Sequence, residues 1–375
     1  MNSQSRAIVF FRSTCRLLAA LAVAGLAVAG VASAAGIYRI VPLPLPPGAV
    51  TYPTVAGINN ADDAVGSLTL DHASRAVAWT AASGYAPRLL PMGNATGATA
   101  AAINDAGDIV GQFLNNPRAV LWRGEDAILL ATPASSDSDA RHIDAHGVVY
   151  GNTAHPFAGT WDTIWSTPST PRELRYDYLR GPFDQMGVRG INDAGVIVGF
   201  ASAYADGNVH AFRRSQGRRV QLLEELPDQG SVFLYDALDV NNAGQVVGEA
   251  LSSSTWRALL WNRNGSVRDL GGIPAYENAS YHAQYINDLG VVTGSYSWAD
   301  DGYQGFVWTA ATGMRSIVDL IDPQDPLYPL VAAGTPLLIQ GINNKGTMIA
   351  MLGFNADPAA RIPVVLVPQL PLHPR

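Results

Sequence analysis

Short runs of hydrophobic residues alternate with polar turns along most of the chain. One phrase, an Ile or Val followed by a polar turn that usually ends in glycine, occurs seven times, beginning at Ile58, Ile103, Ile143, Ile191, Val240, Ile286 and Ile342. Neighbouring copies begin 40 to 56 residues apart. This spacing is typical of one four-stranded propeller blade or of one helical repeat.

The fifth copy predicts four strands. Residues 237–240 form a hydrophobic run, residues 241–244 form an Asn/Gly turn, and residues 245–248 return as a second strand. Residues 257–261 and 266–270 predict the third and fourth strands. Asn and Gly tolerate the left-handed backbone that tight hairpins require. β-branched and aromatic residues dominate these runs and no 3.6-residue period is sustained, which disfavours a helical repeat.

A large aromatic residue ends the expected third strand in most copies. The tryptophans that we assign to this place are Trp79, Trp122, Trp161, Trp261 and Trp308. Arg214 stands there in the fourth copy. A fixed position before a turn favours packing between neighbouring sheets over a ligand platform, because a large ring fills the wedge between sheets.

The two ends of the repeat region predict how the sheets are completed. The seventh copy has three expected strands and no fourth, whereas residues 36–43 form a strand-like run without partners before it. Placing this N-terminal strand in the last sheet closes a ring and leaves no open edge. We therefore predict an all-β fold, a seven-bladed β-propeller of four-stranded antiparallel blades over residues 35–368, with a C-terminal tail at 369–375. An open solenoid would need capping repeats, and none is visible.

The first 34 residues have the layout of a secretory signal peptide. Three arginines come before an apolar run at 17–31, and small residues at 32–34 offer a cleavage site. The run is short for a membrane span, although an uncleaved anchor is the alternative. Cleavage would remove the single cysteine and make the net charge of −7 more negative by three. We expect a secreted, periplasmic or cell-surface protein.

Charge and motifs limit the partners. The acidic balance argues against nucleic acid, for which basic patches supply most of the affinity. Lys345 is the single lysine, so no polybasic patch predicts membrane association after signal cleavage. His142 and His146 have a metal-ligand spacing but lie across a predicted turn. We therefore expect no metal and no cofactor, and we expect a monomer.

The repeat resembles the bacterial extracellular repeat family named after its His-Ala-Phe (HAF) motif. That motif occurs literally once, at residues 210–212, whereas the general form Ile-Asn-x-x-Gly-x-Val-Val-Gly followed by an Ala-x-x-Trp strand covers essentially the whole chain after the signal segment. Two departures are Asp63 where the first copy should have glycine and Asp144 in place of asparagine. The resemblance implies an exported bacterial protein of β-propeller shape and no particular activity.

Loops of variable sequence lie at the strand ends opposite the stereotyped turns. Because functional residues gather on loops held by a rigid scaffold, we expect function on this face. The variable loops hold Tyr204, Trp256, Trp298 and Tyr303 among Asp, Asn and Ser residues. Such aromatic faces beside polar groups suit a sugar-like ligand or a protein partner, and packing against neighbouring loops is the alternative.

The expected innermost strands add polar candidates. Residues two and four positions before the repeated Ile or Val vary in chemistry, whereas those three positions before it are apolar throughout. Strand alternation predicts that the variable set faces a central channel. The candidate cluster at the channel mouth is Asp139, Arg141, Arg189, Asp236, His282 and Gln284. Simple pairing of Asp with Arg is the alternative to a chemical role.

These features favour a binding or scaffolding module for an extracellular or cell-envelope polysaccharide or protein. The alternative is a carbohydrate-active hydrolase or lyase that uses Asp139 and Asp236, and a third possibility is a structural repeat protein of the cell surface. The sequence has no nucleophile elbow, P-loop or zinc-peptidase motif. A non-catalytic role is therefore the first interpretation.

Overall fold

The computed structural model describes residues 37–132, 137–155, 159–174, 183–203, 207–216, 218–227, 232–252, 255–298, 302–353 and 360–369. The chain divides into two units, Met1–Ala35 and Gly36–Arg375, and the strands of the described residues belong to the second. The predicted signal peptide and residues 370–375 of the predicted tail lie outside the described residues.

The second unit is all-β and mostly antiparallel. Its first twelve repeat strands form three four-stranded sheets: β2 (Ala49–Ile58), β3 (Ala64–Leu70), β4 (Ala73–Trp79), β5 (Pro87–Leu89); β6 (Ala98–Ile103), β7 (Ile109–Phe113), β8 (Arg118–Arg123), β9 (Asp126–Leu129); β10 (Ser138–Ile143), β11 (Val149–His155), β12 (Gly159–Trp165), β13 (Pro171–Glu173). Within each sheet the strands follow one another in chain order.

The next two sets of strands form one eight-stranded sheet. They are β14 (Phe183–Ile191), β15 (Ile197–Ala203), β16 (Val209–Arg214), β17 (Gln221–Leu222); and β18 (Val232–Val240), β19 (Val246–Ser252), β20 (Thr255–Trp261), β21 (Val267–Asp269). A single parallel bridge, Val209 with Leu234, joins the two sets. Each set otherwise has the same antiparallel order as the four-stranded sheets.

Strands from both ends of the described chain share the last sheet. After β22 (Ser280–Ile286), β23 (Val292–Trp298), β24 (Gly302–Thr309) and β25 (Gly313–Ser316) come β26 (Leu337–Ile342), β27 (Met348–Leu352) and β28 (Ile362–Pro368). β1 (Tyr38–Pro42) pairs antiparallel with β28 along its whole length. The segment before β26 contains the short helix α1 (Tyr328–Ala332). The buried Asp325, which precedes this helix, accepts a hydrogen bond from the backbone N–H of Ile40 at 2.7 Å.

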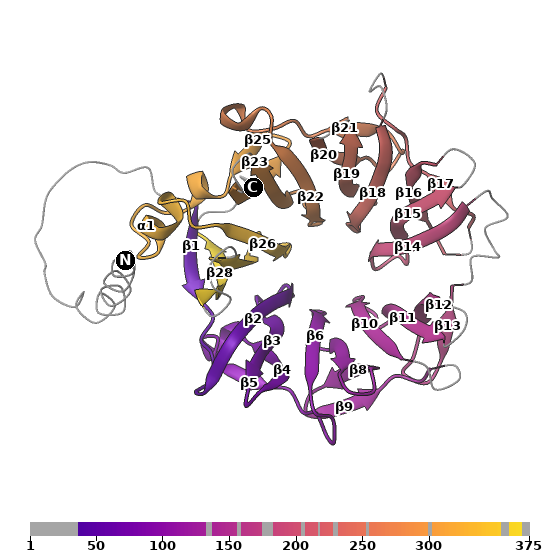
Figure 1. Cartoon of the computed structure of the whole chain (residues 1–375), viewed down its shortest axis with the longest axis vertical. Coiled ribbons are helices and arrows are strands. Elements are labelled where there is room, and N and C mark those ends of the chain that lie inside the picture. The colour runs from indigo at the N-terminus through magenta and orange to yellow at the C-terminus, as the bar shows by residue number, and fades with distance from the viewer. Residues whose placement is uncertain are drawn as a thin grey trace, which may run out of the picture. The chain divides into compact units, whose positions relative to one another are not determined.

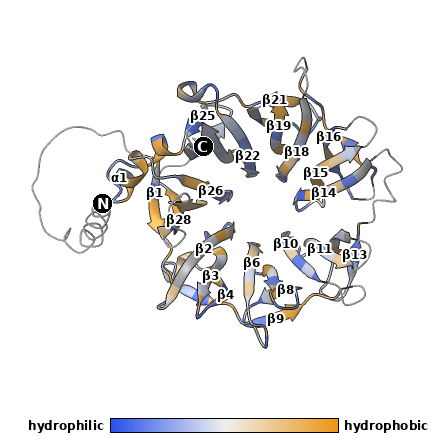
Figure 2. Cartoon of the chain, in the orientation of Figure 1, coloured by the Kyte–Doolittle hydropathy of each residue, from blue (hydrophilic) through white to orange (hydrophobic). Residues whose placement is uncertain are grey.

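The strand sets lie side by side around a common centre (Figure 1), with β2, β6, β10, β14, β18, β22 and β26 innermost. Figure 2 shows hydrophobic residues along β28 and more hydrophilic residues on β10 and β14. In the part of the chain that the structure describes, no helix is long and apolar enough to cross a lipid bilayer.

Every innermost strand carries a β-bulge at the same place, two residues before the repeated Ile or Val. The extra residues are Ala56, Ala101, Arg141, Arg189, Leu238, Gln284 and Gln340. The simple alternation expected from the sequence is therefore wrong at this point, because a bulge turns the following side chains. The glycine of the Val-Val-Gly phrase lies opposite. At Gly111 or Gly248 an added Cβ would lie 1.9–2.0 Å from a carbonyl oxygen of the bulged strand.

The repeat tryptophan packs between neighbouring strand sets. Trp79, Trp122 and Trp261 are at most 1% exposed. Each indole Nε1 donates to a backbone carbonyl that follows the last strand of the preceding set, at 2.7–2.8 Å. The strand register corrects one assignment, since Trp165, paired with Val149, holds this position in the third copy, and Trp161 does not. Arg214 does occupy the position in the fourth copy, where it pairs with Ile197.

The Asn/Gly turns bond each set to the next. The first asparagine of a turn donates from Nδ2 to the backbone carbonyl of its counterpart in the next copy at 2.8–3.1 Å, in the series Asn59, Asn104, Asn192, Asn241, Asn287 and Asn343. Asp144 takes the asparagine's place in the third copy and cannot donate when ionised. The turns therefore form a belt with one defect.

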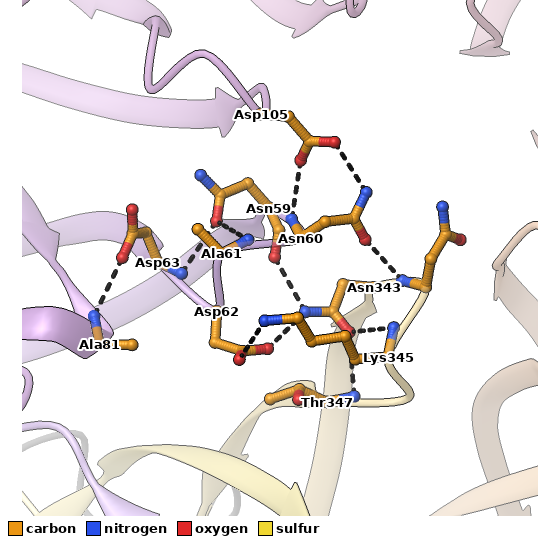
Figure 3. A network of polar contacts seen from close by, with 11 residues as sticks. Asn59, Asn60, Ala61, Asp62, Asp63, Ala81, Asp105, Asn343, Lys345 and Thr347 are labelled. Carbon is orange, nitrogen blue, oxygen red and sulfur yellow. Dashed lines mark hydrogen bonds and ion pairs between the residues drawn. The ribbon is translucent and has the colours of Figure 1, made fainter. Parts of the chain in front are cut away.

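The belt also joins the last copy to the first (Figure 3). Asn343 Nδ2 donates to the Asn59 carbonyl at 2.8 Å and to Asp62 Oδ1 at 2.7 Å, and Lys345 Nζ pairs with Asp62 Oδ2 at 2.9 Å. Asp62 has φ 68° and donates its N–H to the Asn59 carbonyl, as Gly107 does to Asn104. Asp62, and not Asp63, therefore takes the place of the repeat glycine.

Candidate functional site

Five polar or aromatic side chains from three neighbouring strand sets lie in contact with one another. They are Arg189 of β14, Asp236 of β18, Glu249 of β19, Trp256 of β20 and His282 of β22, and we call them the inner polar cluster. Bonds within and between the sets connect them. The cluster combines two carboxyl groups, a guanidinium, an imidazole and an indole.

An ion pair links the β14 and β18 strands. Arg189 Nε donates to Asp236 Oδ2 at 3.1 Å. The guanidinium of Arg189 also lies over the ring of Phe200, 5.0 Å from its centroid, which adds a cation–π contact. Because Arg189 is the bulged residue of its strand, the bulge sets the position of this cation.

Asp236 is the most buried charged side chain of the cluster. It is 8% exposed, and its second oxygen, Oδ1, has no hydrogen-bond partner among the residues that the structure describes. Burial raises the pKa of Asp236 to about 6, Arg189 opposes this rise, and the neighbouring Glu249 adds to it. Asp236 and Glu249 are register partners on adjacent strands, where two like charges repel.

A histidine and a tryptophan complete the cluster. His282 Nδ1 lies 2.6 Å from Glu249 Oε2, so the imidazole bridges the β18–β21 and β22–β25 sets. The ring of Trp256 lies 5.4 Å from that of His282, tilted by 42°. The strand of His282, β22, also bonds Trp256, whose backbone N–H donates to Ser280 Oγ at 3.2 Å.

Asp139 and Arg141 form a separate pair. Arg141 Nε contacts Asp139 Oδ2 on the same strand, β10. No hydrogen bond or ion pair in the described ranges joins Asp139 to Asp236, and each carboxylate is paired with its own arginine. Those ranges also contain no group of three or more His, Cys, Asp or Glu residues placed to hold a metal ion.

The remaining sequence candidates lie elsewhere. Trp298 packs against Tyr276 and Tyr296, with ring centroids 4.8 and 5.4 Å away. Tyr303 is 41% exposed on β24, and Gln284 is the half-buried bulged residue of β22. Tyr204 lies outside the described residues.

Glu249 was missing from the sequence candidates. It directly follows Gly248 of the Val-Val-Gly phrase, and the register places every such residue opposite the residue four before the repeated Ile or Val. Thr99 pairs with Gln112 in the same way. Aligning the two strands of the hairpin across their turn would have placed Glu249 opposite Asp236 from the sequence alone.

Comparisons with known proteins give likenesses of structure alone. No family model and no curated protein sequence matches the chain. The structure is similar to that of streptogramin B lyase, with TM-score 0.48 and 9% identity, over 89% of this chain and 98% of that one. It is also similar to YCF48 bound to a peptide (TM-score 0.45, 11% identity, 88% and 95% covered) and to the SapL1 lectin in complex with alpha methyl fucoside (0.40, 14%, 72% and 96%). At these values none of them indicates an activity.

Proposed function

We propose that the second unit is a seven-bladed β-propeller closed by its N-terminal strand. Counting the eight-stranded sheet as two blades joined by one bridge gives seven blades of equal strand order. The pairing of β1 with β28 and the bonds from Asn343 and Lys345 to the first turn support closure. Kinship with the extracellular His-Ala-Phe repeats and export through residues 1–34 belong to the same proposal and rest on the sequence.

Removing residues 36–43 tests closure. Tyr38, Ile40 and Leu43 are at most 5% exposed, so their loss uncovers core and the edge of β28. The melting temperature should fall by about 10 °C or more. Unchanged melting of the shortened protein would contradict closure.

We further propose that the protein is a monomeric binding module and that the inner polar cluster contacts the ligand. The observation that carries this is the series of contacts from Trp256 through His282 and Glu249 to Asp236, whose Oδ1 is a buried acceptor without a described partner. Buried polar atoms without partners are rare in folded proteins and indicate a missing donor. Arg189 covers this carboxyl group with a side chain that is 46% exposed, so it can move aside for a ligand.

A hydroxylated ligand fits the cluster best. Sugar hydroxyl groups donate to carboxylates and accept from guanidinium, and the indole face packs against the apolar face of a sugar ring. We therefore place an extracellular or cell-envelope polysaccharide first and a protein partner second.

Binding of purified protein, without residues 1–34, to a panel of oligosaccharides tests this by calorimetry. Trp256→Ala and Glu249→Gln should each weaken binding about tenfold, and Tyr303→Ala, an exposed aromatic outside the cluster, should change it less than about twofold. An equal loss in Tyr303→Ala would place the ligand elsewhere. Failure of every saccharide to bind would favour the protein partner.

One observation favours a second candidate, a carbohydrate-active enzyme. A carboxyl group with pKa raised to about 6 and a second carboxylate on the neighbouring strand resemble an acid and its partner. The pair would be Asp236 and Glu249, because Asp139 belongs to another sheet and no described bond joins it to Asp236. Reducing ends that appear with the wild type and disappear in Asp236→Asn would favour catalysis, whereas binding without product would exclude it for that saccharide.

A further inference from the structure

A cavity of about 610 Å³ lies between the β10–β13 and β14–β17 sets, away from the inner polar cluster. Tyr150, Ile164, Leu174 and Ile197 line its apolar part. Three of these side chains are at most 9% exposed and belong to the hydrophobic core between the two sets. The volume is within the range of small-molecule sites, about 300–1,000 Å³.

The cavity lies where the repeat loses its tryptophan. Arg214 is paired with Ile197 as Trp165 is paired with Val149 and Trp261 with Val246. Arg214 Nε donates to the carbonyl of Arg218 at 3.1 Å, in the turn between β16 and β17, so the side chain is bonded to its own hairpin.

The loss of tryptophan is not sufficient for a cavity. In β28 the corresponding residue is Leu366, paired with Met348. Leu366 is fully buried in a core that also contains Tyr38 and Ile321. The apolar substitute is thus buried in the core, whereas a cavity lies beside the charged one, whose Nε is bonded to its own turn.

The cavity also offers an acceptor. Asp144 lines it, and Asp144 Oδ1 accepts the N–H groups of His146 and Val148 at 2.9 Å each. Within the described ranges Asp144 Oδ2 accepts no hydrogen bond. In other copies an asparagine Nδ2 at this position donates across to the next set.

We propose that this cavity binds a small molecule with one flat aromatic ring that carries an N–H or O–H donor. The ring would occupy the space that an indole fills in the Trp-containing copies, against Ile164 and Ile197. Its donor would bond Asp144 Oδ2. Arg172 and Arg214 also line the cavity and would contact the ring face.

Indole is the probe, and ligand-observed NMR on the purified protein is the measurement. We expect a dissociation constant of about 0.1–1 mM. Arg214→Trp should fill the cavity and weaken binding at least about tenfold while raising the melting temperature. Arg218→Trp places the same new side chain on the exposed turn and should leave binding unchanged.

No indole binding at millimolar concentration, or equal binding to wild type and Arg214→Trp, would overturn the proposal. If Arg214→Trp does not fold, Ile164→Phe narrows the same space from β12 and should also weaken binding. N-methylindole lacks the N–H donor and should bind at least about threefold more weakly. Equal affinity for the two probes would overturn the role assigned to Asp144.

Discussion

The two sides of the β14–β17 set differ in how they meet their neighbours. Toward β18–β21, Trp261 fills the interface and bonds Glu224, Asn192 bonds the Asn241 carbonyl, and the Arg189–Asp236 ion pair crosses between the sets. Toward β10–β13, the equivalents of that tryptophan and that asparagine are Arg214 and Asp144, and a cavity lies between the sets. One repeat scaffold thus makes a filled or a hollow interface through two residues.

The largest expected effect comes from removing the filled side's tryptophan. Trp261→Ala should lower the free energy of unfolding by about 3–5 kcal/mol, because it deletes a fully buried indole and its hydrogen bond. Arg214→Ala should cost about 1 kcal/mol or less, since the cavity already exists there. Urea denaturation of both variants measures the difference.

Similar losses of unfolding free energy in Trp261→Ala and Arg214→Ala would contradict the difference between the filled and hollow interfaces, because both would then be packed alike. A larger loss in Trp261→Ala supports it only if the slope of the unfolding free energy with urea is unchanged, since a changed slope means altered two-state behaviour.

A second test titrates the ion pair on the filled side. Folding raises the pKa of Asp236 from its ordinary 3.8 to about 6, so the folded state binds more protons between these values and its stability falls as the pH rises through them. The Asp236→Asn side chain resembles the neutral form of Asp236, so this variant should lack the fall in stability with rising pH. Relative to the wild type, the variant should gain about 2–3 kcal/mol between pH 4 and pH 8, measured by denaturation at each pH.

The wild type and Asp236→Asn both contain Asp239, and burial raises the pKa of Asp239 to about 6. The titration of Asp239 therefore contributes to the pH dependence of stability in both proteins. The difference between wild type and variant cancels this contribution if the two sites are independent. A difference that does not depend on pH would show that Asp236 is not a source of electrostatic strain.

The smallest expected effect comes from restoring the missing hydrogen bond of the belt on the hollow side. Asp144→Asn supplies the Nδ2 donor that Asn192 and its counterparts use, directed at the carbonyl of the next copy. The variant should gain about 1 kcal/mol of unfolding free energy at neutral pH. The gain should shrink in acid, because burial raises the pKa of Asp144 and its protonated form can also donate.

The reverse exchange, Asn192→Asp, is the matched control on the filled side, and it should cost a comparable amount. If Asp144→Asn is neutral while Asn192→Asp destabilises, the restored Nδ2 donor does not reach the Asn192 carbonyl, although Ala145 N–H already bonds Asp193 Oδ1 between the same two turns at 2.8 Å. Hydrogen exchange would then show faster amide exchange in β10 than in β18.

The sequence predicted the strand order of each set, the charged replacement at Arg214 and the placement of the N-terminal run beside the last strands. Errors of assignment arose in the third copy and in the first. Trp161 and Trp165 lie four residues apart in the same expected strand region, and the pairing of Val149 with Trp165 distinguishes them. Asp62 lies four residues after Ile58, as Gly107 lies after Ile103, so counting would have assigned it correctly, and its backbone φ of 68° confirms it as the substitute for glycine.

Periodicity and turn chemistry are local, so the sequence by itself determined which residues form strands, which turns join them and which row packs inward. Only the tertiary structure decided which polar side chains meet. A bulge places Arg189 beside Asp236, hairpin register adds Glu249, and His282 reaches that carboxylate from a neighbouring set. The cavity at Arg214 likewise depends on how two sets pack, because a missing side chain can be compensated by neighbours, as at Leu366, or left as space.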